Sequence, residues 1–154
     1  MKTGFSLFQA LLISCLIGIM TLGLLVFSDL NKIQKVNKAS FFYKMDHDFF
    51  ISDSSKALIR AIGNKTPIFK INGGNFDAYN VDDYLAFFEM LKNYWDDGII
   101  SEKYLYNMYS YYIIEAYRNK EIQNYIESFR KETNDTTYYK NFENLAIRFI
   151  EKSE

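Results

Sequence analysis

The stretch Trp95–Glu102, WDDGIISE, has the acidic residues and the glycine that a calcium-binding loop requires. In a calcium-binding helix-loop-helix, the glycine is loop position six, oxygen ligands occupy positions one, three and five, and a bidentate acid occupies position twelve. With Gly98 at position six, positions three and twelve are a tryptophan and a tyrosine, which cannot serve. We therefore interpret the stretch as a turn between two helices, in which Gly98 ends the first helix, Ile99 and Ile100 point inward and Ser101 caps the second helix.

Three glutamates, Glu89, Glu115 and Glu143, lie beside apolar stripes in segments with helical periodicity. Carboxylates that gather in a cleft can act as general acid and base when burial shifts their pKa values. Such a hydrolase would require all three glutamates to converge on one pocket. The alternative, which we favour, is that they form ion pairs at helix edges. The arginines available as partners are Arg118, Arg130 and Arg148.

The only histidine of the chain, His47, lies between Asp46 and Asp48. Zinc normally needs three or four protein ligands, and the chain offers no second histidine and a single cysteine. We interpret Asp46-His47-Asp48 as a solvated linker, and we expect no metal site and no cofactor. Because no glycine-rich phosphate loop, Ser-His-Asp set or paired metal motif is found, we also predict that the protein is not an enzyme.

The strongest signal in the chain is an uncharged run from Phe5 to Phe27, FSLFQALLISCLIGIMTLGLLVF. At 1.5 Å per residue, a helix of this length crosses a hydrocarbon core about 30 Å thick. We therefore predict a transmembrane helix, which divides the chain into several parts. These are a tail at residues 1–4, the transmembrane helix at 5–27, a basic juxtamembrane linker at 28–48, and a helical domain at 49–154 with a loop insertion at 65–80.

Two alternatives compete with the transmembrane helix. A cleaved signal peptide has an apolar region of about 7–15 residues followed by small residues at the cleavage site, whereas this run is longer and ends in VFSDL. A lipoprotein signal is suggested by Leu12-Ile13-Ser14-Cys15, but mostly apolar residues follow Cys15, where a lipoprotein normally becomes polar. We therefore favour the anchor and regard Cys15 as a small apolar side chain in the span.

The charges that flank the apolar run predict its orientation. Lys2 and the amino terminus precede the run, whereas four lysines follow it: Lys32, Lys35, Lys38 and Lys44. The positive-inside bias then predicts a single-pass protein of the inner membrane with a cytoplasmic C-terminal domain. With 18 basic and 19 acidic residues the net charge is −1, so no broad basic surface indicates nucleic acid. The expected partners are the lipid bilayer, another protein and, as an alternative, a second copy of the chain.

Four segments after residue 80 repeat apolar residues at helical spacing. The first contains Tyr84, Phe87, Phe88, Leu91 and Trp95, and the second contains Leu105, Met108, Tyr109, Tyr112, Ile113 and Ala116. The third contains Ile122, Tyr125, Ile126 and Phe129, and the fourth contains Phe142, Leu145, Ala146, Phe149 and Ile150. Because no stripe can be buried alone, we predict an all-α fold in which a small antiparallel bundle of four to five helices follows the transmembrane helix.

The boundaries before these segments follow from capping residues. A short helix is predicted over Lys56–Ile62, with Ser54 or Asp53 as its N-terminal cap and Gly63 at its C-terminal end, where a left-handed residue is favoured. Residues 65–80 contain the only proline and a Gly-Gly pair, and they predict a loop that holds a small hairpin. The next helix is predicted to begin at Asn80, with Asp83 completing an approximate capping box.

The second periodic segment is unusually rich in tyrosine. The residues are Tyr104, Tyr106, Tyr109, Tyr111, Tyr112 and Tyr117, and they surround the predicted helix on several sides. A helix that is aromatic all round is either central or presents one face to a partner. We favour a central helix, and a tyrosine face for partner binding is the alternative.

Several of these positions together resemble a known family. They are Phe87-Phe88-Glu89, Gly98-Ile99-Ile100, Glu102, Glu115-Ala116-Tyr117, Ile126, Arg130 and Tyr139-x-x-Phe142-Glu143-x-x-Ala146. Over roughly residues 81–147, together with the N-terminal span, the chain resembles a bacterial membrane-anchored family known only as a domain of unknown function. The resemblance implies a short helical domain behind a membrane segment, and it implies no activity. The loop at 65–80 departs from the compact pattern of that family.

Three functional hypotheses follow. The leading one is a membrane-tethered protein-interaction module. The second is a membrane-acting defence or stress effector, in which spans containing Gly18 and Gly23 associate. The third is a hydrolase that uses the three glutamates. The residues singled out as interaction or structural candidates are Glu89, Glu115, Arg130, Glu143, Tyr109 and Tyr112.

Overall fold

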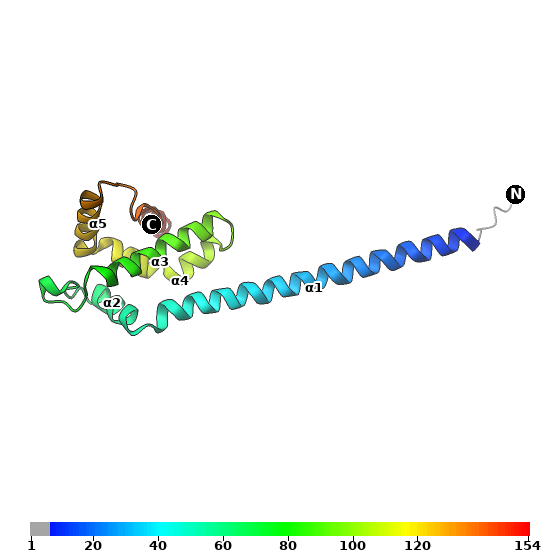
Figure 1. Ribbon diagram of the computed structural model, residues 1–154, viewed down its shortest axis with the longest axis horizontal. Helices are drawn as coiled ribbons and strands as arrows, with labels where there is room; N and C mark the ends of the chain where they lie inside the picture. Colours follow the sequence, from blue (N-terminus) through cyan, green and yellow to red (C-terminus); the bar gives the residue numbers. More distant parts are fainter. Residues whose placement is uncertain (1–6) are drawn as a thin grey trace. The chain divides into compact units, whose positions relative to one another are not determined.

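The computed structural model describes the backbone of residues 7–154 and the side chains of residues 11–34 and 36–154. The predicted tail at residues 1–4, and Phe5 and Ser6 of the predicted transmembrane helix, lie outside the described residues. The chain divides into two compact units, Met1–His47 and Asp48–Glu154. Figure 1 shows the helices of both units, coloured along the sequence.

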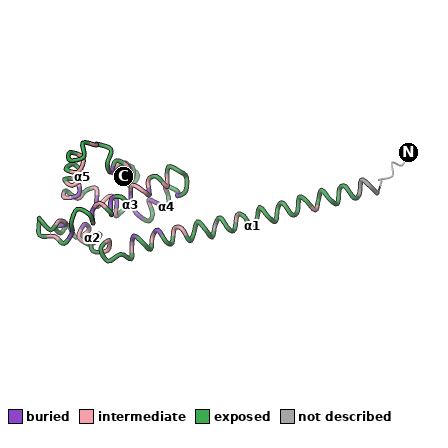
Figure 2. The backbone as a smooth tube through the Cα atoms, viewed as in Figure 1, coloured by how far each residue is buried: buried purple, intermediate pink, exposed green. Residues whose placement is uncertain are grey.

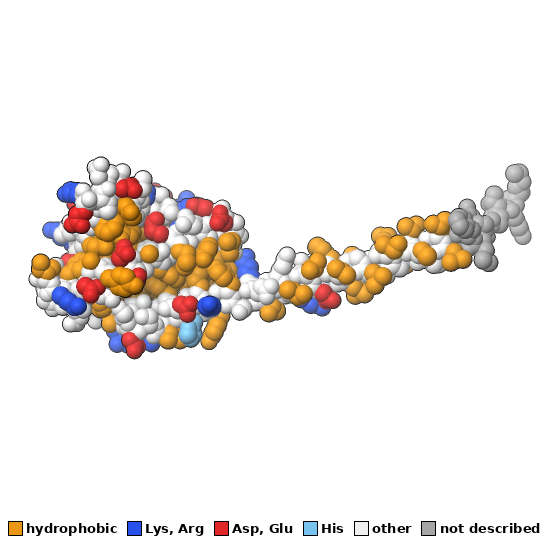
Figure 3. All heavy atoms as spheres, viewed as in Figure 1, with side chains coloured by type: hydrophobic (Ala, Val, Ile, Leu, Met, Phe, Trp, Pro, Cys, Tyr) orange, Lys and Arg blue, Asp and Glu red, His pale blue; other side chains and the backbone are white. Residues whose placement is uncertain are grey.

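Helix α1 spans Leu7–Ile51 and has 45 residues, which corresponds to about 68 Å at 1.5 Å per residue. Its most apolar 18-residue window has a mean hydropathy of 2.5 and is 0% buried. Figure 2 shows most of α1 as exposed, and Figure 3 shows hydrophobic side chains along it. By length and composition, α1 is one helix that could cross a membrane.

The segment predicted as a linker, residues 28–48, belongs to α1 and is helical. The sequence has no glycine between Gly23 and Gly63 and no proline before Pro67, so no strong helix-breaking residue interrupts this stretch. The helix ends where Ser52 leaves the helical region, with φ −55° and ψ 124°.

The second unit contains the last turn of α1 and all remaining helices. They are α2 (Asp53–Gly63), the 3₁₀ helix η1 (Lys70–Asn72), α3 (Ala78–Asp96), α4 (Glu102–Arg118), α5 (Lys120–Thr133) and α6 (Lys140–Ser153). The predicted all-α class is confirmed, since within residues 7–154 the only β interaction is an isolated bridge between Phe69 and Phe76. Helices α3 and α4 run in opposite directions (Figure 1). Helix α4 contacts α2, α3, α5 and α6, as expected of a central helix.

The start of α2 differs from the prediction. The helix begins at Asp53, and the Ser52 hydroxyl caps it by accepting the Ser55 N–H at 3.5 Å. Gly63 is the last helical residue, and the left-handed residue that follows the helix is Lys65, at φ 55°. The prediction that Gly63 is left-handed was therefore wrong, because the helix extends through Gly63 and the left-handed conformation falls on Lys65.

The start of α3 also differs from the prediction. The helix begins at Ala78, and its capping box joins Asp77 and Asn80. The Asp77 carboxylate accepts the Asn80 N–H at 3.3 Å, and the Asn80 side chain accepts the Asp77 N–H at 3.2 Å. Asn80 is thus the third residue of the helix and Asp83 lies a turn further on. The preceding loop contains η1 and the single bridge instead of the expected hairpin.

The turn between α3 and α4 confirms the main prediction for WDDGIISE. Gly98 is left-handed, at φ 69°, and its N–H donates to the Trp95 carbonyl at 2.9 Å. The Ser101 hydroxyl accepts the Tyr104 N–H at 3.2 Å and caps α4. Ile100 is buried, but Ile99 is 41% exposed, so the prediction that both isoleucines point inward was wrong for Ile99.

The core of the second unit is largely aromatic. Tyr109 on α4, Phe88 on α3 and Phe142 on α6 are completely buried. Phe49, in the last turn of α1, stacks on Phe87 with 4.2 Å between ring centroids. Buried residues appear in purple where the helices face each other in Figure 2. Much of the aromatic content of the sequence is therefore used for helix packing.

Candidate functional site

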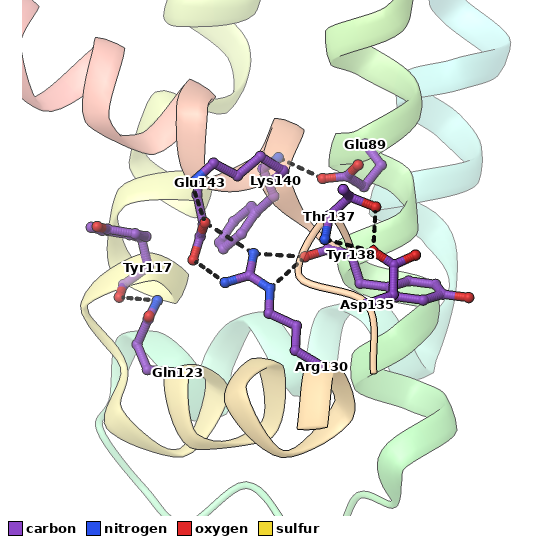
Figure 4. Close-up of polar contacts among 10 residues, drawn as sticks. Glu89, Tyr117, Gln123, Arg130, Asp135, Thr137, Tyr138, Lys140 and Glu143 are labelled. Carbon is purple, nitrogen blue, oxygen red and sulfur yellow. Dashed lines mark hydrogen bonds and ion pairs between the residues drawn. The ribbon is translucent and has the colours of Figure 1, made fainter. Parts of the chain in front are cut away.

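A polar cluster joins α5 to the start of α6 and contains two of the predicted candidates, Arg130 and Glu143 (Figure 4). Nη1 and Nη2 of Arg130 each lie 3.0 Å from a carboxylate oxygen of Glu143. Nε and Nη2 of Arg130 also donate to the Tyr138 carbonyl, at 2.9 and 2.6 Å. The side chains of Arg130 and Glu143 are only 18% and 14% exposed. This network fixes the α5–α6 connection to both helices.

Glu89, on α3, supplies the N-terminal cap of α6. The N-cap position of α6 is Tyr139, which is left-handed and makes no capping hydrogen bond through its side chain. The Glu89 carboxylate instead accepts the Phe142 N–H at 2.6 Å (Figure 4). A tyrosine cannot act as the short acceptor that helix starts favour, so α6 depends on a carboxylate from another helix.

The pKa values of Glu89 and Glu143 are shifted in opposite directions. Burial raises the pKa of Glu89, and the N–H groups of Phe142 and Asn141 only partly oppose that effect. Burial also acts to raise the pKa of Glu143, but hydrogen bonding and charge attraction from Arg130 outweigh it and lower the pKa. Each carboxylate already accepts from a donor of the protein, so their immediate role is to hold α3, α5 and α6 together.

Glu115 does not join this cluster. It lies 3.8 Å from Arg118, and it lines a different hollow of about 400 Å³ together with Lys65 and Lys120. The hydrolase hypothesis required Glu89, Glu115 and Glu143 to converge on one pocket, and the structure does not place Glu115 with the other two.

The two candidate tyrosines belong to the packing of α4. Tyr109 is completely buried, and its ring stacks parallel to that of Phe50 with 5.9 Å between centroids. Tyr112 is partly buried, and its backbone carbonyl accepts the Tyr84 hydroxyl at 3.1 Å. Of the predicted tyrosine face, Tyr111 is the side chain most open to solvent, at 59% exposure.

A hollow of about 640 Å³, here called the α3 hollow, lies between α3 and the α5–α6 connection. Its lining includes three carboxylates, from Asp82, Glu89 and Asp97. Its aromatic lining consists of Tyr94, Phe129, Tyr138 and Tyr139. Asp82 accepts a hydrogen bond from the Tyr139 hydroxyl, and burial followed by this bond raises the pKa of Tyr139 far above its usual range. Apart from Glu89, these residues were not among the predicted site residues.

A second hollow of about 460 Å³, here called the α5 hollow, lies between the 65–77 loop and α5. Its lining includes Glu121, Tyr125, Phe129 and Glu132, all on α5. These residues recur at spacings of four, four and three, which places them on one helical face. That spacing was a signal that sequence reasoning could have used to find this surface.

Glu121 attaches the loop to α5. Its carboxylate accepts the Ile68 and Phe69 N–H groups at 3.3 and 3.1 Å and the Asn72 side-chain amide at 2.9 Å. Burial opposes ionisation, but these three donors together outweigh it and lower the pKa of Glu121. The role of Glu121 was not predicted, because its donors lie about fifty residues earlier in the chain.

The residues Asp46-His47-Asp48 lie near the end of α1 and are helical. Across the part of the chain that the structure describes, no group of three or more His, Cys, Asp or Glu side chains is arranged to hold a metal ion.

Taken together, these features define a class of protein with a small all-α domain that follows one long apolar helix. The chain belongs to the family described as "Domain of unknown function (DUF4760)", whose family model matches residues 13–149. This match confirms the resemblance seen in the sequence. The matched range includes residues 65–80, and the interpretation of that loop as an insertion stays a prediction. No curated protein matches the chain, and no solved structure matches it.

Proposed function

We propose that the protein is a membrane-tethered protein-interaction module, in which α1 crosses the bilayer once and the helical second unit lies in the cytoplasm. The observation that carries the proposal is the exposure of large apolar side chains in residues 11–27 of α1, each between 43% and 69% exposed. These side chains are Leu11, Leu12, Ile13, Leu16, Ile17, Ile19, Met20, Leu22, Leu24, Leu25, Val26 and Phe27.

The energetic argument favours lipid around this part of α1. Full burial of one such side chain contributes about 1.5–3 kcal/mol. For twelve side chains that are roughly half exposed, transfer from water to hydrocarbon therefore contributes on the order of 10–20 kcal/mol. The helix also satisfies its own backbone hydrogen bonds, as a bilayer requires.

The orientation is proposed from the lysines of α1. Lys32, Lys38 and Lys44 are the described basic side chains of residues 28–48, and Asp29, Asp46 and Asp48 are the acids there. The positive-inside bias counts lysine and arginine near the end of a span and gives acidic residues little weight. This supports a cytoplasmic second unit.

The interaction role is proposed because membrane attachment confines the second unit to one surface. Confinement raises the effective concentration of the unit toward any partner in the same membrane. The unit also carries the α3 and α5 hollows, which combine aromatic walls with carboxylates. Ligand sites typically combine apolar walls with a few convergent polar groups.

A charge-insertion experiment tests the anchor. In the variant Leu16→Arg/Met20→Arg, two arginines would lie near the middle of the span. Each would raise the free energy of membrane insertion by about 2.5–3.5 kcal/mol. We expect this variant to leave the membrane fraction on alkaline carbonate extraction, while the natural protein stays in it. The matched control Ile33→Arg/Val36→Arg places the same charges on exposed positions of α1 beyond the span and should stay membrane-bound. Natural protein in the soluble fraction would contradict the proposal.

Accessibility to a thiol reagent tests the orientation. In a Cys15→Ser background, the variant Ser153→Cys carries one thiol on α6, where Ser153 is exposed. We expect a membrane-impermeant maleimide to label this thiol only after the cells are permeabilised. Labelling of intact cells would place the second unit outside and refute the proposed orientation.

A further inference from the structure

The α3 and α5 hollows flank a single aromatic side chain. Phe129, on α5, lines both hollows. Its ring lies 5.9 Å from that of Tyr125 and 4.9 Å from that of Tyr138, measured between centroids. We call these three rings, of Tyr125, Phe129 and Tyr138, the aromatic ridge. Tyr125 lines the α5 hollow, Tyr138 lines the α3 hollow and Phe129 lines both.

The charged residues that line these two hollows are all acidic. Asp82, Glu89 and Asp97 line the α3 hollow, and Glu121 and Glu132 line the α5 hollow. No lysine or arginine is part of either lining. In Figure 3, hydrophobic and acidic side chains lie next to each other on the visible face of the helical unit. By contrast, the hollow beside Glu115 is lined by lysines and an arginine as well as by glutamates.

The five carboxylates differ in whether they already accept hydrogen bonds from other groups of the protein. Asp82, Glu89 and Glu121 accept hydrogen bonds from Tyr139, Phe142 and the loop. Within the described part of the chain, the carboxylates of Asp97 and Glu132 form no hydrogen bond or ion pair. Each hollow therefore contains one carboxylate that can pair with a ligand without loss of a contact that holds the fold together.

The chemistry of this surface fits a cationic ligand with two charges. An ammonium or guanidinium group is attracted to the face of an aromatic ring within about 6 Å of its centroid. The same group can pair with a carboxylate beside the ring. Tyr138 is 42% exposed and lines the α3 hollow together with Asp97, so this hollow offers both a solvent-exposed aromatic side chain and a carboxylate.

We propose that the aromatic ridge and the two hollows form a docking surface for a lysine- or arginine-rich segment of a partner protein, with one basic side chain in each hollow. A basic segment is favoured because its positive charges complement the carboxylates that line both hollows. The inference rests on the proposed function, since it names the kind of partner that the tethered module binds.

A binding experiment with paired variants tests the docking surface. The full chain is placed in nanodiscs of phosphatidylcholine, whose head groups carry no net charge, and the probe is a fluorescein-labelled peptide of alternating lysine and glycine. In Asp97→Asn/Glu132→Gln we expect binding, followed by fluorescence anisotropy, to weaken about tenfold, which corresponds to two ion pairs. The matched control Asp83→Asn/Glu127→Gln removes the same charge from α3 and α5 outside both hollows and should weaken binding less than about twofold.

The aromatic contribution has its own variant pair. Tyr138→Leu should weaken binding several-fold because it removes the ring face, whereas Tyr138→Phe keeps the ring and should bind normally. Thermal unfolding of every variant, followed by circular dichroism, checks that the fold is intact. The backbone carbonyl of Tyr138 still accepts from Arg130 in both variants, so the α5–α6 connection is retained.

Several results would overturn the docking proposal. They are the absence of peptide binding by the natural protein, an equal loss in the two double variants, and normal binding by Tyr138→Leu. Self-association of the chain that Asp97→Asn/Glu132→Gln abolishes would identify a second copy as the occupant and would also overturn it. Carbonate extraction of the same protein reports on the membrane anchor separately, so failure of docking and failure of the anchor are distinguishable.

Discussion

Replacement of Arg130 by methionine is the sharpest test of how the second unit is held together. Methionine keeps much of the length of the side chain but removes the ion pair with Glu143 and both hydrogen bonds to the Tyr138 carbonyl. Hydrogen bonds that involve a charged group contribute about 1.5–3 kcal/mol each. Lys140, 3.3 Å from Glu143, can take over part of the neutralisation. We therefore expect the free energy of unfolding to fall by about 2–4 kcal/mol.

The measurement is denaturant unfolding of the full chain in detergent micelles, followed by the fluorescence of Trp95, the only tryptophan. The matched control is Arg118→Met. Arg118 is 60% exposed and lies 3.8 Å from Glu115, so its loss should lower the free energy of unfolding by less than about 1 kcal/mol. A double-mutant cycle of Arg130→Met with Glu143→Gln should give a coupling of about 1–2 kcal/mol. Equal effects at Arg130 and Arg118, or additive effects in the cycle, would refute the reasoning.

The same variants predict a pH dependence. The pKa of Glu143 is lowered in the folded protein, so its stabilising contribution is present above its ordinary pKa of about 4.3. That contribution is lost as the pH falls through the lower, folded pKa. The difference in unfolding free energy between the natural protein and Arg130→Met should therefore be largest above about pH 5 and should shrink in more acidic solution. A difference that grows on acidification would contradict this assignment.

Three further predictions concern single residues. Glu89→Ala removes the cap of α6 and should lower the free energy of unfolding by about 1–2 kcal/mol, and an unchanged denaturation midpoint would show that α6 does not need the carboxylate. Glu121→Ala should speed hydrogen exchange at the Ile68 and Phe69 amides by at least about tenfold, as expected for a lost hydrogen bond of about 1.5 kcal/mol or more, and unchanged exchange would rule out the loop attachment. Gly98→Ala should lower the free energy of unfolding by about 1–2 kcal/mol, because a φ of 69° is strained for an L-residue. Nothing lies within 4 Å of the added Cβ, so the effect comes from the backbone alone, and thermal unfolding measures it.

The helices could be predicted from the sequence because their signals are local. The turn at Gly98 and the cap at Ser101 follow from residues within one short stretch. The start of α3 was misplaced because Asp77 and Asn80 form a better capping pair than Asn80 and Asp83. Ile99 was misplaced because periodicity does not determine which residue of a turn points inward.

The candidate site was predictable only in part. Glu89 and Glu143 were recognised from their places beside apolar stripes, and Arg130 was recognised as an available ion-pair partner. The ion pair between Arg130 and Glu143 was among the expected pairings. The backbone partners were not predicted, because Glu89 caps a helix that begins about fifty residues later and Arg130 binds a backbone carbonyl that no side-chain pattern reveals. Glu115 has the same sequence signature as Glu89, yet it lies in another hollow.

By itself, the sequence determined the helical class and the one apolar helix long enough to cross a membrane, because hydrophobic spacing and length act along a single segment. Tertiary structure alone decided that carboxylates and aromatic rings of α3, α5 and the α5–α6 connection meet at two hollows, while the fully buried Tyr109 became part of the core. The physical reason is that contacts between segments far apart in the chain depend on how the helices pack, which no local pattern encodes.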